Sequence, residues 1–193
     1  MEKIAILADS GCQIPVDSRE NEGIFIAPLT ITMEGKSYLD DIEIHSIDVF
    51  KRMEKDDIMV MTSQPSTGSL QEAVQKIKDQ GYSHVIGLPI ATGLSSTMNG
   101  MKLACDMLEM PVTLVDTKGT ASNQKYLVEV AAKLAREGKS PEEIKDILEK
   151  LVEDSATIIM VPNLEHLKKG GRITPAVAAL AGLLKIVPIM KLN

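Results

Sequence analysis

The sequence of 193 residues has no tryptophan, few aromatic residues, two cysteines and no long apolar run. Cys12 and Cys105 lie far apart without Cys-x-x-Cys spacing, which favours free thiols in a reducing compartment over a disulfide framework or a cysteine metal site. No apolar stretch reaches the roughly 18 residues that a membrane span requires. The short apolar run at the N-terminus is followed by Asp9, so it predicts a buried strand rather than a signal peptide, in a cytoplasmic protein.

An excess of positive charge is also missing. Lys and Arg number 21 against 27 Asp and Glu, which gives a net charge of −6. Both signs are mixed along the chain and no basic stripe with interleaved aromatic residues is present, so we expect no nucleic-acid partner. The length allows one ordinary domain, or one domain with part of a second.

Short β-rich runs alternate with helical patterns along the chain. Two helices carry clear start signals: residues 69–81 with a Ser69–Glu72 capping box, and residues 140–155 with Ser140 as cap and Pro141 at the first helical position. Apolar strands separated by helices need cover on both faces, so the sequence predicts an α/β fold with a mostly parallel sheet flanked by helices. The predicted strands are 3–8, 24–32, 58–62, 84–89, 112–116 and 157–162.

The chain changes character after residue 162. Residues 163–173 predict a short basic helix that ends at a pair of glycines, and residues 174–193 predict an apolar helix followed by a strand. We therefore expect one domain over residues 1–162 and the beginning of a second α/β subdomain over residues 163–193. The last strand needs a partner from earlier in the chain, from a second copy in a homo-oligomer, or from residues beyond this sequence.

Two hydroxyl-rich loops each follow a predicted strand and precede a helix. One contains Thr62 and Ser63, and the other contains Ser95 and Ser96. Ligands of open α/β sheets bind beyond the carboxyl ends of the strands, where helix N-termini and small polar side chains converge. Hydroxyl groups donate to an anion without adding a full charge. The pair of loops predicts a site for a carboxylate or phosphate, although a single hydroxyl is more often a helix cap.

A nucleophilic serine is the alternative interpretation, and it would make the protein a small-molecule hydrolase or phosphotransferase that uses Ser95. The GLSST segment lacks the second glycine of the Gly-x-Ser-x-Gly turn. The three histidines offer no clear base, because His45 is expected to open a helix, His84 to start a strand and His166 to lie on the short basic helix. We therefore expect no catalytic residue.

Nucleotide and metal motifs are also missing from the sequence, since neither a P-loop nor a dinucleotide fingerprint is present. Asp9 and Asp116 each end a predicted strand without metal-ligand spacing, and an Asp at such a place usually closes a turn. We expect no metal and no cofactor.

Several motifs in sequence order resemble the DegV family of fatty-acid-binding proteins. They are ADSGC, TSQPSTGSL, GLSST, the VDT strand end, and LEHLKKGGRI before an apolar helix, and together they span essentially the whole chain. The resemblance implies a carrier without catalysis of its own, with two α/β subdomains. It would hold one long-chain fatty acid, with the carboxylate at polar residues and the tail in an apolar tunnel. Members of the FakB type present this acid to a separate fatty acid kinase subunit, which forms an acyl phosphate.

Carried over by motif, Thr62 and Ser95 are the expected head-group hydroxyls, with Ser63 and Ser96 beside them. The resemblance places Arg172 of the GGRI segment either near the head group or on the surface shown to the kinase.

The tunnel lining and the end of the chain are two further expectations. Met101, Leu103, Leu108 and the helix over residues 174–184 are candidates for the tunnel lining, although each of them taken alone is more often packed core. Chains of the family are longer and usually bring a C-terminal histidine to the carboxylate, so this sequence is expected to lack that C-terminal part.

Overall fold

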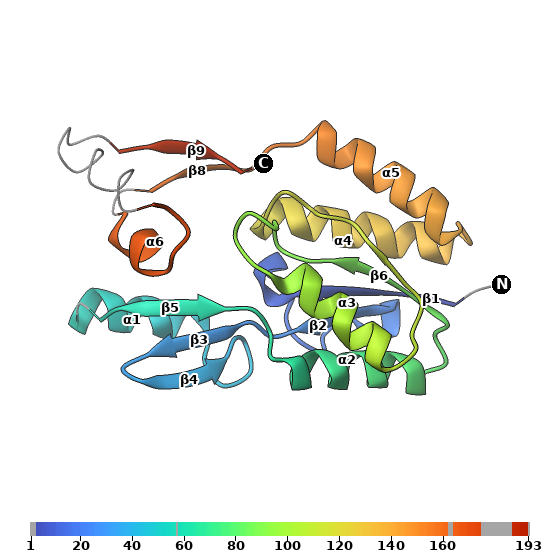
Figure 1. Ribbon diagram of the computed structural model, residues 1–193, viewed down its shortest axis with the longest axis horizontal. Coiled ribbons are helices and arrows are strands. Elements are labelled where there is room, and N and C mark those ends of the chain that lie inside the picture. Colours follow the sequence, from blue (N-terminus) through green and yellow to red (C-terminus); the bar gives the residue numbers. More distant parts are fainter. Residues whose placement is uncertain (1–2, 57, 162–163, 175–186, 193) are drawn as a thin grey trace.

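The computed structural model describes residues 3–56, 58–161, 164–174 and 187–192 (Figure 1). The strands are β1 (Ile4–Asp9), β2 (Ile24–Ala27), β3 (Thr30–Met33), β4 (Lys36–Leu39), β5 (Val60–Ser63), β6 (His84–Leu88), β7 (Val112–Leu114), β8 (Ile158–Met160) and β9 (Ile189–Lys191). The helices are α1 (Ser46–Asp56), α2 (Thr67–Asp79), α3 (Thr97–Met107), α4 (Ala121–Arg136), α5 (Pro141–Glu153) and α6 (Glu165–Lys169), with short 3-10 helices η1 (Ser10–Cys12) and η2 (Glu20–Glu22).

A parallel sheet in the order β2-β1-β6-β7 forms the centre of the larger part of the molecule. Successive side chains of β1 point to opposite faces. Ile6 packs with residues of α4 and α5, whereas Leu7 packs with residues of α2 and α3. Both faces of the sheet are therefore covered by helices, as Figure 1 shows. The predicted α/β fold is confirmed.

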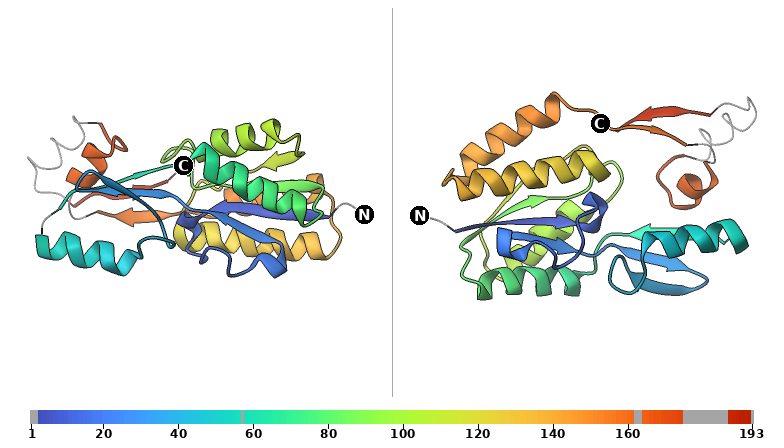
Figure 2. Two further views of the ribbon diagram at one scale, coloured as in Figure 1. Left: turned by 90° about the horizontal axis from the view of Figure 1, so that it is seen from below. Right: turned by 180° about the vertical axis from the view of Figure 1, so that it is seen from behind.

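A second, antiparallel sheet in the order β4-β3-β5 carries α1 on one side. The prediction of one strand over residues 24–32 is wrong, because this run forms β2 in the parallel sheet and β3 in the antiparallel one. Pro28 lies between them, and a proline has no N–H to donate to a ladder. Ile31 and Val49 belong to a separate small core beneath α1. Figure 2 shows that this sheet and α1 lie at one end of the molecule.

The predicted helix start is confirmed for α5 and is wrong for α2. Ser140 and Glu143 form the predicted capping box, with Pro141 as the first helical residue. The capping residue of α2 is Ser66, whose Oγ accepts the N–H of Ser69 at 3.0 Å. The segment has two serines three residues apart, and α2 begins one turn earlier than the sequence predicted because the first of them fills the cap.

Strands β8 and β9 form an antiparallel pair in which Ile159 lies opposite Met190. The last strand therefore finds its partner earlier in the chain. This pairing crosses the boundary predicted at residues 162–163, and the division into two domains stays a prediction. The apolar helix expected over residues 174–184 lies almost entirely outside the described residues. Among the residues that are described, no helix is long and apolar enough to cross a membrane.

Both cysteines are buried free thiols, as their spacing predicted. Burial raises the pKa of Cys12 to about 12 and that of Cys105 to about 11. A thiol is reactive as the thiolate, so neither side chain is poised as a nucleophile at neutral pH.

The core beneath α5 is expected to contribute strongly to stability. Leu148 of α5 is fully buried in the cluster that contains Ile6. Replacing it with alanine leaves a cavity and is expected to lower the free energy of unfolding by about 2–5 kcal/mol, measured by urea denaturation. Leu103→Ala is the matched control, because Leu103 is 51% exposed and its loss should change stability by less than about 0.5 kcal/mol. Equal effects of the two substitutions would contradict this assignment of the core.

Candidate functional site

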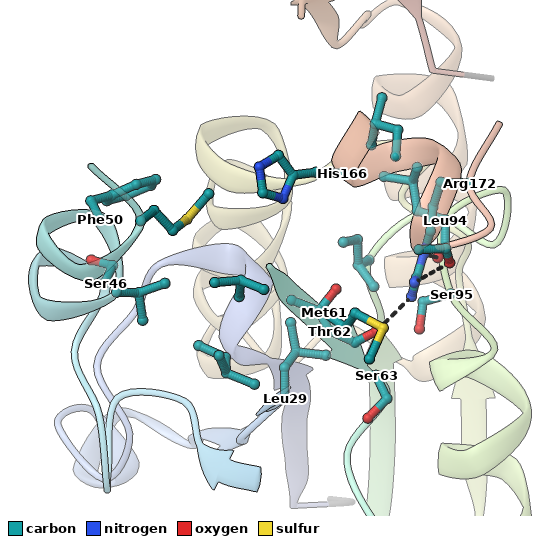
Figure 3. Close-up of a pocket in the computed structure, with 17 residues that line it drawn as sticks. Leu29, Ser46, Phe50, Met61, Thr62, Ser63, Leu94, Ser95, His166 and Arg172 are labelled. Carbon is teal, nitrogen blue, oxygen red and sulfur yellow. Dashed lines mark hydrogen bonds between the residues drawn. The ribbon is translucent and has the colours of Figure 1, made fainter. Parts of the chain in front are cut away.

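A cavity of about 390 Å³ lies between the antiparallel sheet with α1, the loop after β6, and α6 (Figure 3). Its wall is mainly apolar. The lining residues are Leu29, Ile31, Ser46, Val49, Phe50, Met53, Val60, Met61, Thr62, Ser63, Ile90, Leu94, Ser95, His166, Leu167, Gly170 and Arg172. Elements far apart in the sequence therefore build one cavity, since residues 29–63, 90–95 and 166–172 all contribute to it.

Four of the five predicted site residues meet at one end of this cavity. Thr62 and Ser63 come from β5, Ser95 comes from the loop after β6, and Arg172 follows α6. Figure 3 shows Arg172 between the loop of Ser95 and the strand of Thr62. The opposite side of the cavity, beside Phe50 of α1, is mainly apolar. The cavity therefore has a polar end and an apolar body.

Arg172 connects the two hydroxyl-bearing segments through their backbones. Its Nε donates to the carbonyl oxygen of Leu94 at 3.1 Å and its Nη2 donates to that of Thr62 at 3.0 Å. Its Nη1 donates to the carbonyl oxygen of Gly170 at 2.6 Å, within the glycine turn. No carboxylate of the described residues forms an ion pair with this guanidinium. Its positive charge is thus available to an anion at the polar end of the cavity.

A second cavity of about 400 Å³ adjoins the first one and is more polar. Ser63, Ser95 and Arg172 line both cavities, whereas Ser96 and Gln64 line only the second. Ser96 is therefore separated from the apolar body, unlike its neighbour Ser95. Ser63, Ser95 and Arg172 therefore stand where the two cavities meet.

The two expected head-group hydroxyls have different local surroundings. Ser95 Oγ lies 2.8 Å from Thr97 Oγ1 and accepts the N–H of Thr97, the first residue of α3, at 3.3 Å. The Thr62 side chain is exposed and has no hydrogen-bond partner among the described residues. No described histidine or carboxylate hydrogen-bonds to Ser95, so the geometry gives no support to a nucleophile activated by a neighbouring base.

The histidines lie where the sequence placed them. His45 directly precedes α1, and its carbonyl oxygen accepts the N–H groups of Asp48 and Val49 in the first turn. His84 is the first residue of β6. His166 lies on α6 and is the one histidine that lines the cavity of about 390 Å³.

Buried polar contacts hold the loop that carries Ser95. Asp9 accepts the N–H of Ile90 at 2.7 Å, that of Gly11 at 3.0 Å, and Gln124 Nε2 at 3.2 Å. Burial raises the pKa of the Asp9 carboxyl, against the opposing effect of these hydrogen bonds. Asp9 therefore anchors the chain at the point where it leaves β6, as expected for an Asp that closes a turn.

Asp116 anchors the same loop from β7. Its carboxylate accepts the N–H of Thr92 at 3.2 Å, the Thr92 hydroxyl and the N–H of Lys118 at 3.0 Å. The N–H of Ala91 also donates to the carbonyl oxygen of Gly119 at 2.8 Å. Both aspartates predicted to act in turns thus fix the loop whose end carries Ser95.

The strand that carries Thr62 was expected in the parallel sheet, which is wrong, because β5 is an edge strand of the antiparallel sheet. The candidates Met101, Leu103 and Leu108 do not line the cavity. Met101 lies in the core beneath the parallel sheet and Leu108 packs on it, which agrees with the alternative interpretation as packed core, whereas Leu103 is exposed. The actual lining from α1 was missed, although Val49 and Met53 form an apolar stripe in the sequence.

Residues 3–193 match the family model described as an uncharacterised protein of the DegV family. The chain belongs to the DegV family. A DegV domain-containing protein of Staphylococcus aureus is 33% identical over 193 residues, which are 100% of this chain and 68% of that protein.

Two solved DegV structures share the fold. DegV of Bacillus subtilis, described as a fatty acid binding protein, has a TM-score of 0.86 at 30% identity and is matched over 100% of this chain and 69% of that one. A DegV family protein from Thermus thermophilus, described by its fatty acid binding, has a TM-score of 0.83 at 32% identity, with 99% and 68% covered. The matched DegV relatives are therefore longer than this chain.

The hydrogen bonds that Asp9 accepts near the Ser95 loop are expected to stabilise the fold. Asp9→Ala removes the acceptor of three donors, and each buried donor left unpaired costs about 1–3 kcal/mol. We expect the free energy of unfolding to fall by more than about 2 kcal/mol in urea denaturation. Asp106→Ala is the control, because its exposed carboxylate pairs only with Lys102 on the same helix and should contribute less than about 1 kcal/mol. A loss as small for Asp9 as for Asp106 would show that the anchor is not needed.

Proposed function

We propose that this DegV-family protein binds a long-chain fatty acid in the cavity of about 390 Å³ and acts as a carrier. The carboxylate would lie at Thr62, Ser95 and Arg172, and the tail would extend along the apolar wall toward Phe50. The observation that carries this proposal is an apolar cavity that ends where Arg172 joins two hydroxyl-bearing segments. The fatty acid binding of the Bacillus subtilis and Thermus thermophilus relatives supports it.

The size and chemistry of the cavity fit such a ligand. Its volume falls within the range of about 300–1,000 Å³ that small-molecule sites occupy. Each buried CH₂ of a tail contributes about 0.8 kcal/mol, so the tail would supply most of the affinity. The hydroxyls and the guanidinium would offset the desolvation of the carboxylate and fix its position.

The two cavities support separate roles for Arg172, Ser63 and Ser96 in this proposal. Arg172 lines both cavities and donates to the backbones of both hydroxyl-bearing segments, which favours the head-group role over a role only on the kinase surface. Ser63 would lie beside the carboxylate, since it lines both cavities. Ser96 would face the polar side, by which the carboxylate is approached.

We further propose that the head group is presented to a separate fatty acid kinase, which transfers a phosphoryl group to the carboxylate and forms an acyl phosphate. The second, polar cavity gives access to the carboxylate end. Lys168 and Lys169 are exposed on α6 next to this opening and provide positive charge for an acidic partner surface. The geometry of Ser95, whose hydroxyl contacts Thr97 and has no described histidine or carboxylate as a hydrogen-bond partner, supports a carrier rather than a catalyst.

A binding experiment tests the head-group assignment. Thr62→Ala and Ser95→Ala each remove one hydrogen bond to a charged group and should weaken the binding of oleic acid by about 1.5–3 kcal/mol in isothermal titration calorimetry. Ser122→Ala is the control. Ser122 is exposed on α4 and lines neither of the two cavities, so this substitution should leave the affinity unchanged. Circular dichroism checks that Ser95→Ala keeps α3. Unchanged affinity in both variants would remove these hydroxyls from the site, and failure of the wild-type protein to bind any fatty acid would refute the function.

A kinase assay tests the presentation surface. The double substitution Lys168→Glu/Lys169→Glu should reduce acyl-phosphate formation by the partner kinase at least tenfold through charge repulsion, while oleic acid affinity stays within a factor of two. The matched control is Lys145→Glu/Lys150→Glu on α5, which makes the same charge change away from the cavity. Phosphorylation that falls equally in both double variants would show a general charge effect and rule out a specific surface on α6.

A further inference from the structure

The second cavity, of about 400 Å³, offers far more polar space than a carboxylate group fills. The described residues that line it are Ser63, Gln64, Thr92, Gly93, Leu94, Ser95, Ser96, Gly170, Gly171 and Arg172. No aspartate or glutamate is among these lining residues, and Arg172 brings a positive charge. A fatty acid whose tail lies in the first cavity would place only its head group here, and most of the polar space would stay free.

Several hydrogen-bond donors around this cavity have no partner within the described part of the chain. The hydroxyls of Ser63 and Ser96 and the side-chain amide of Gln64 form no hydrogen bond there, and all three residues are exposed. The backbone N–H groups of Gly93 and Ser96 also lack a partner among the described residues. A ligand in the cavity therefore has access to donors that the protein itself does not use.

Two other hydroxyls of the lining are already engaged. The hydroxyl and the N–H of Thr92 both donate to the carboxylate of Asp116, which does not line this cavity. The hydroxyl of Ser95 lies 2.8 Å from Thr97 Oγ1. The free side-chain donors are thus those of residues 63, 64 and 96.

Arg172 also keeps donors free. Its Nη1 donates to the carbonyl oxygen of Gly170 and its Nη2 to that of Thr62. Each terminal nitrogen of a guanidinium carries a second N–H, so each retains one donor. Paired N–H groups on a planar fork match the oxygens of a phosphate group.

A phosphate group fits this set of donors better than a carboxylate does. It presents three acceptor oxygens and carries a charge of about −1.5 to −2 at neutral pH. Free donors and a guanidinium, with no carboxylate in the lining, favour an anion with several oxygens over an uncharged or cationic head group. A phosphate attached to the end of an acyl chain would place these oxygens beyond the point where the two cavities meet.

We infer that the second cavity is a phosphate subsite, and that the ligands of this protein include single-chain lipids that end in a phosphate group. The tail would lie in the first cavity, and the phosphate would lie against Ser63, Ser96 and Arg172. The inference rests on the proposed function, because it requires the tail to occupy that first cavity. Ser96 is the specificity-determining residue, since it lines only the second cavity, whereas Ser63 and Arg172 line both.

The test compares the dissociation constants of myristic acid and of tetradecyl phosphate, which has the same number of carbon atoms, below their critical micelle concentrations. The wild-type protein should bind tetradecyl phosphate about tenfold more tightly, because charge-assisted hydrogen bonds to the phosphate are added. Ser96→Ala should weaken tetradecyl phosphate about tenfold relative to myristic acid, since it removes one donor to a charged group. Ser96→Thr keeps a hydroxyl and should retain the preference.

A third ligand, 1-myristoyl lysophosphatidic acid, distinguishes two sources of the phosphate. It carries a glycerol unit between the chain and the phosphate, whereas an acyl phosphate carries the phosphate directly at the head of the chain, as tetradecyl phosphate does. Tighter binding of tetradecyl phosphate would support the subsite and assign it to acyl phosphates. Tighter binding of lysophosphatidic acid would support the subsite and assign it to glycerol-linked phosphates.

Ser122→Ala is the matched control, because Ser122 is exposed on α4 and lines neither cavity. Circular dichroism checks the fold of each variant. Myristic acid binding without a preference for either phosphate lipid would overturn the phosphate subsite and leave the proposed function standing. A preference that Ser96→Ala reduces no more than Ser122→Ala does would overturn the role of Ser96. Failure to bind all three ligands would instead defeat the proposed function itself.

Discussion

The guanidinium of Arg172 donates to the carbonyl oxygen of Leu94, after a strand of the parallel sheet, and to that of Thr62, on the antiparallel sheet. Arg172 therefore connects two parts of the molecule with separate cores, in addition to the hydrogen bonds that Ser10 makes with Asp40 and Leu29. Arginine suits this place because its planar fork presents several donors in fixed directions, and it stays charged when it is partly buried. Among the described residues, no other side chain forms hydrogen bonds that connect the Leu94 loop to β5. The polar end of the cavity therefore depends on Arg172.

Further hydrogen bonds hold the loop after β6 and strand β5 in place around Arg172. Asp9 and Asp116 accept hydrogen bonds from the loop after β6, and the Ser95 hydroxyl accepts the N–H of Thr97 where the loop ends. On the other side, β3 pairs with β5 and so fixes the strand of Thr62. The segments that carry Thr62, Ser95 and Arg172 are thus held in place by the protein itself, which would reduce the entropy lost if an anion binds there.

Several features of this site were predictable from local sequence and others were not. Thr62, Ser63, Ser95 and Arg172 were identified from their motifs, and four residues in such patterns do line one cavity. The wall formed by Phe50 and Met53 was missed, because an apolar stripe on a helix reads the same whether it packs on a core or faces a cavity. His166 was placed on the correct helix, but its place in the cavity wall depends on distant residues and has no sequence signal.

The sequence by itself determined the α/β alternation, the capping box of α5 and the DegV membership, because periodicity, caps and ordered motifs are local properties of the chain. The tertiary structure alone decided that residues 24–32 divide between two sheets, and that β5 lies outside the parallel one. It also decided that the cavity forms between these sheets and α6. The physical reason is that strand pairing and enclosed space arise from contacts between distant residues, which no short stretch of sequence encodes.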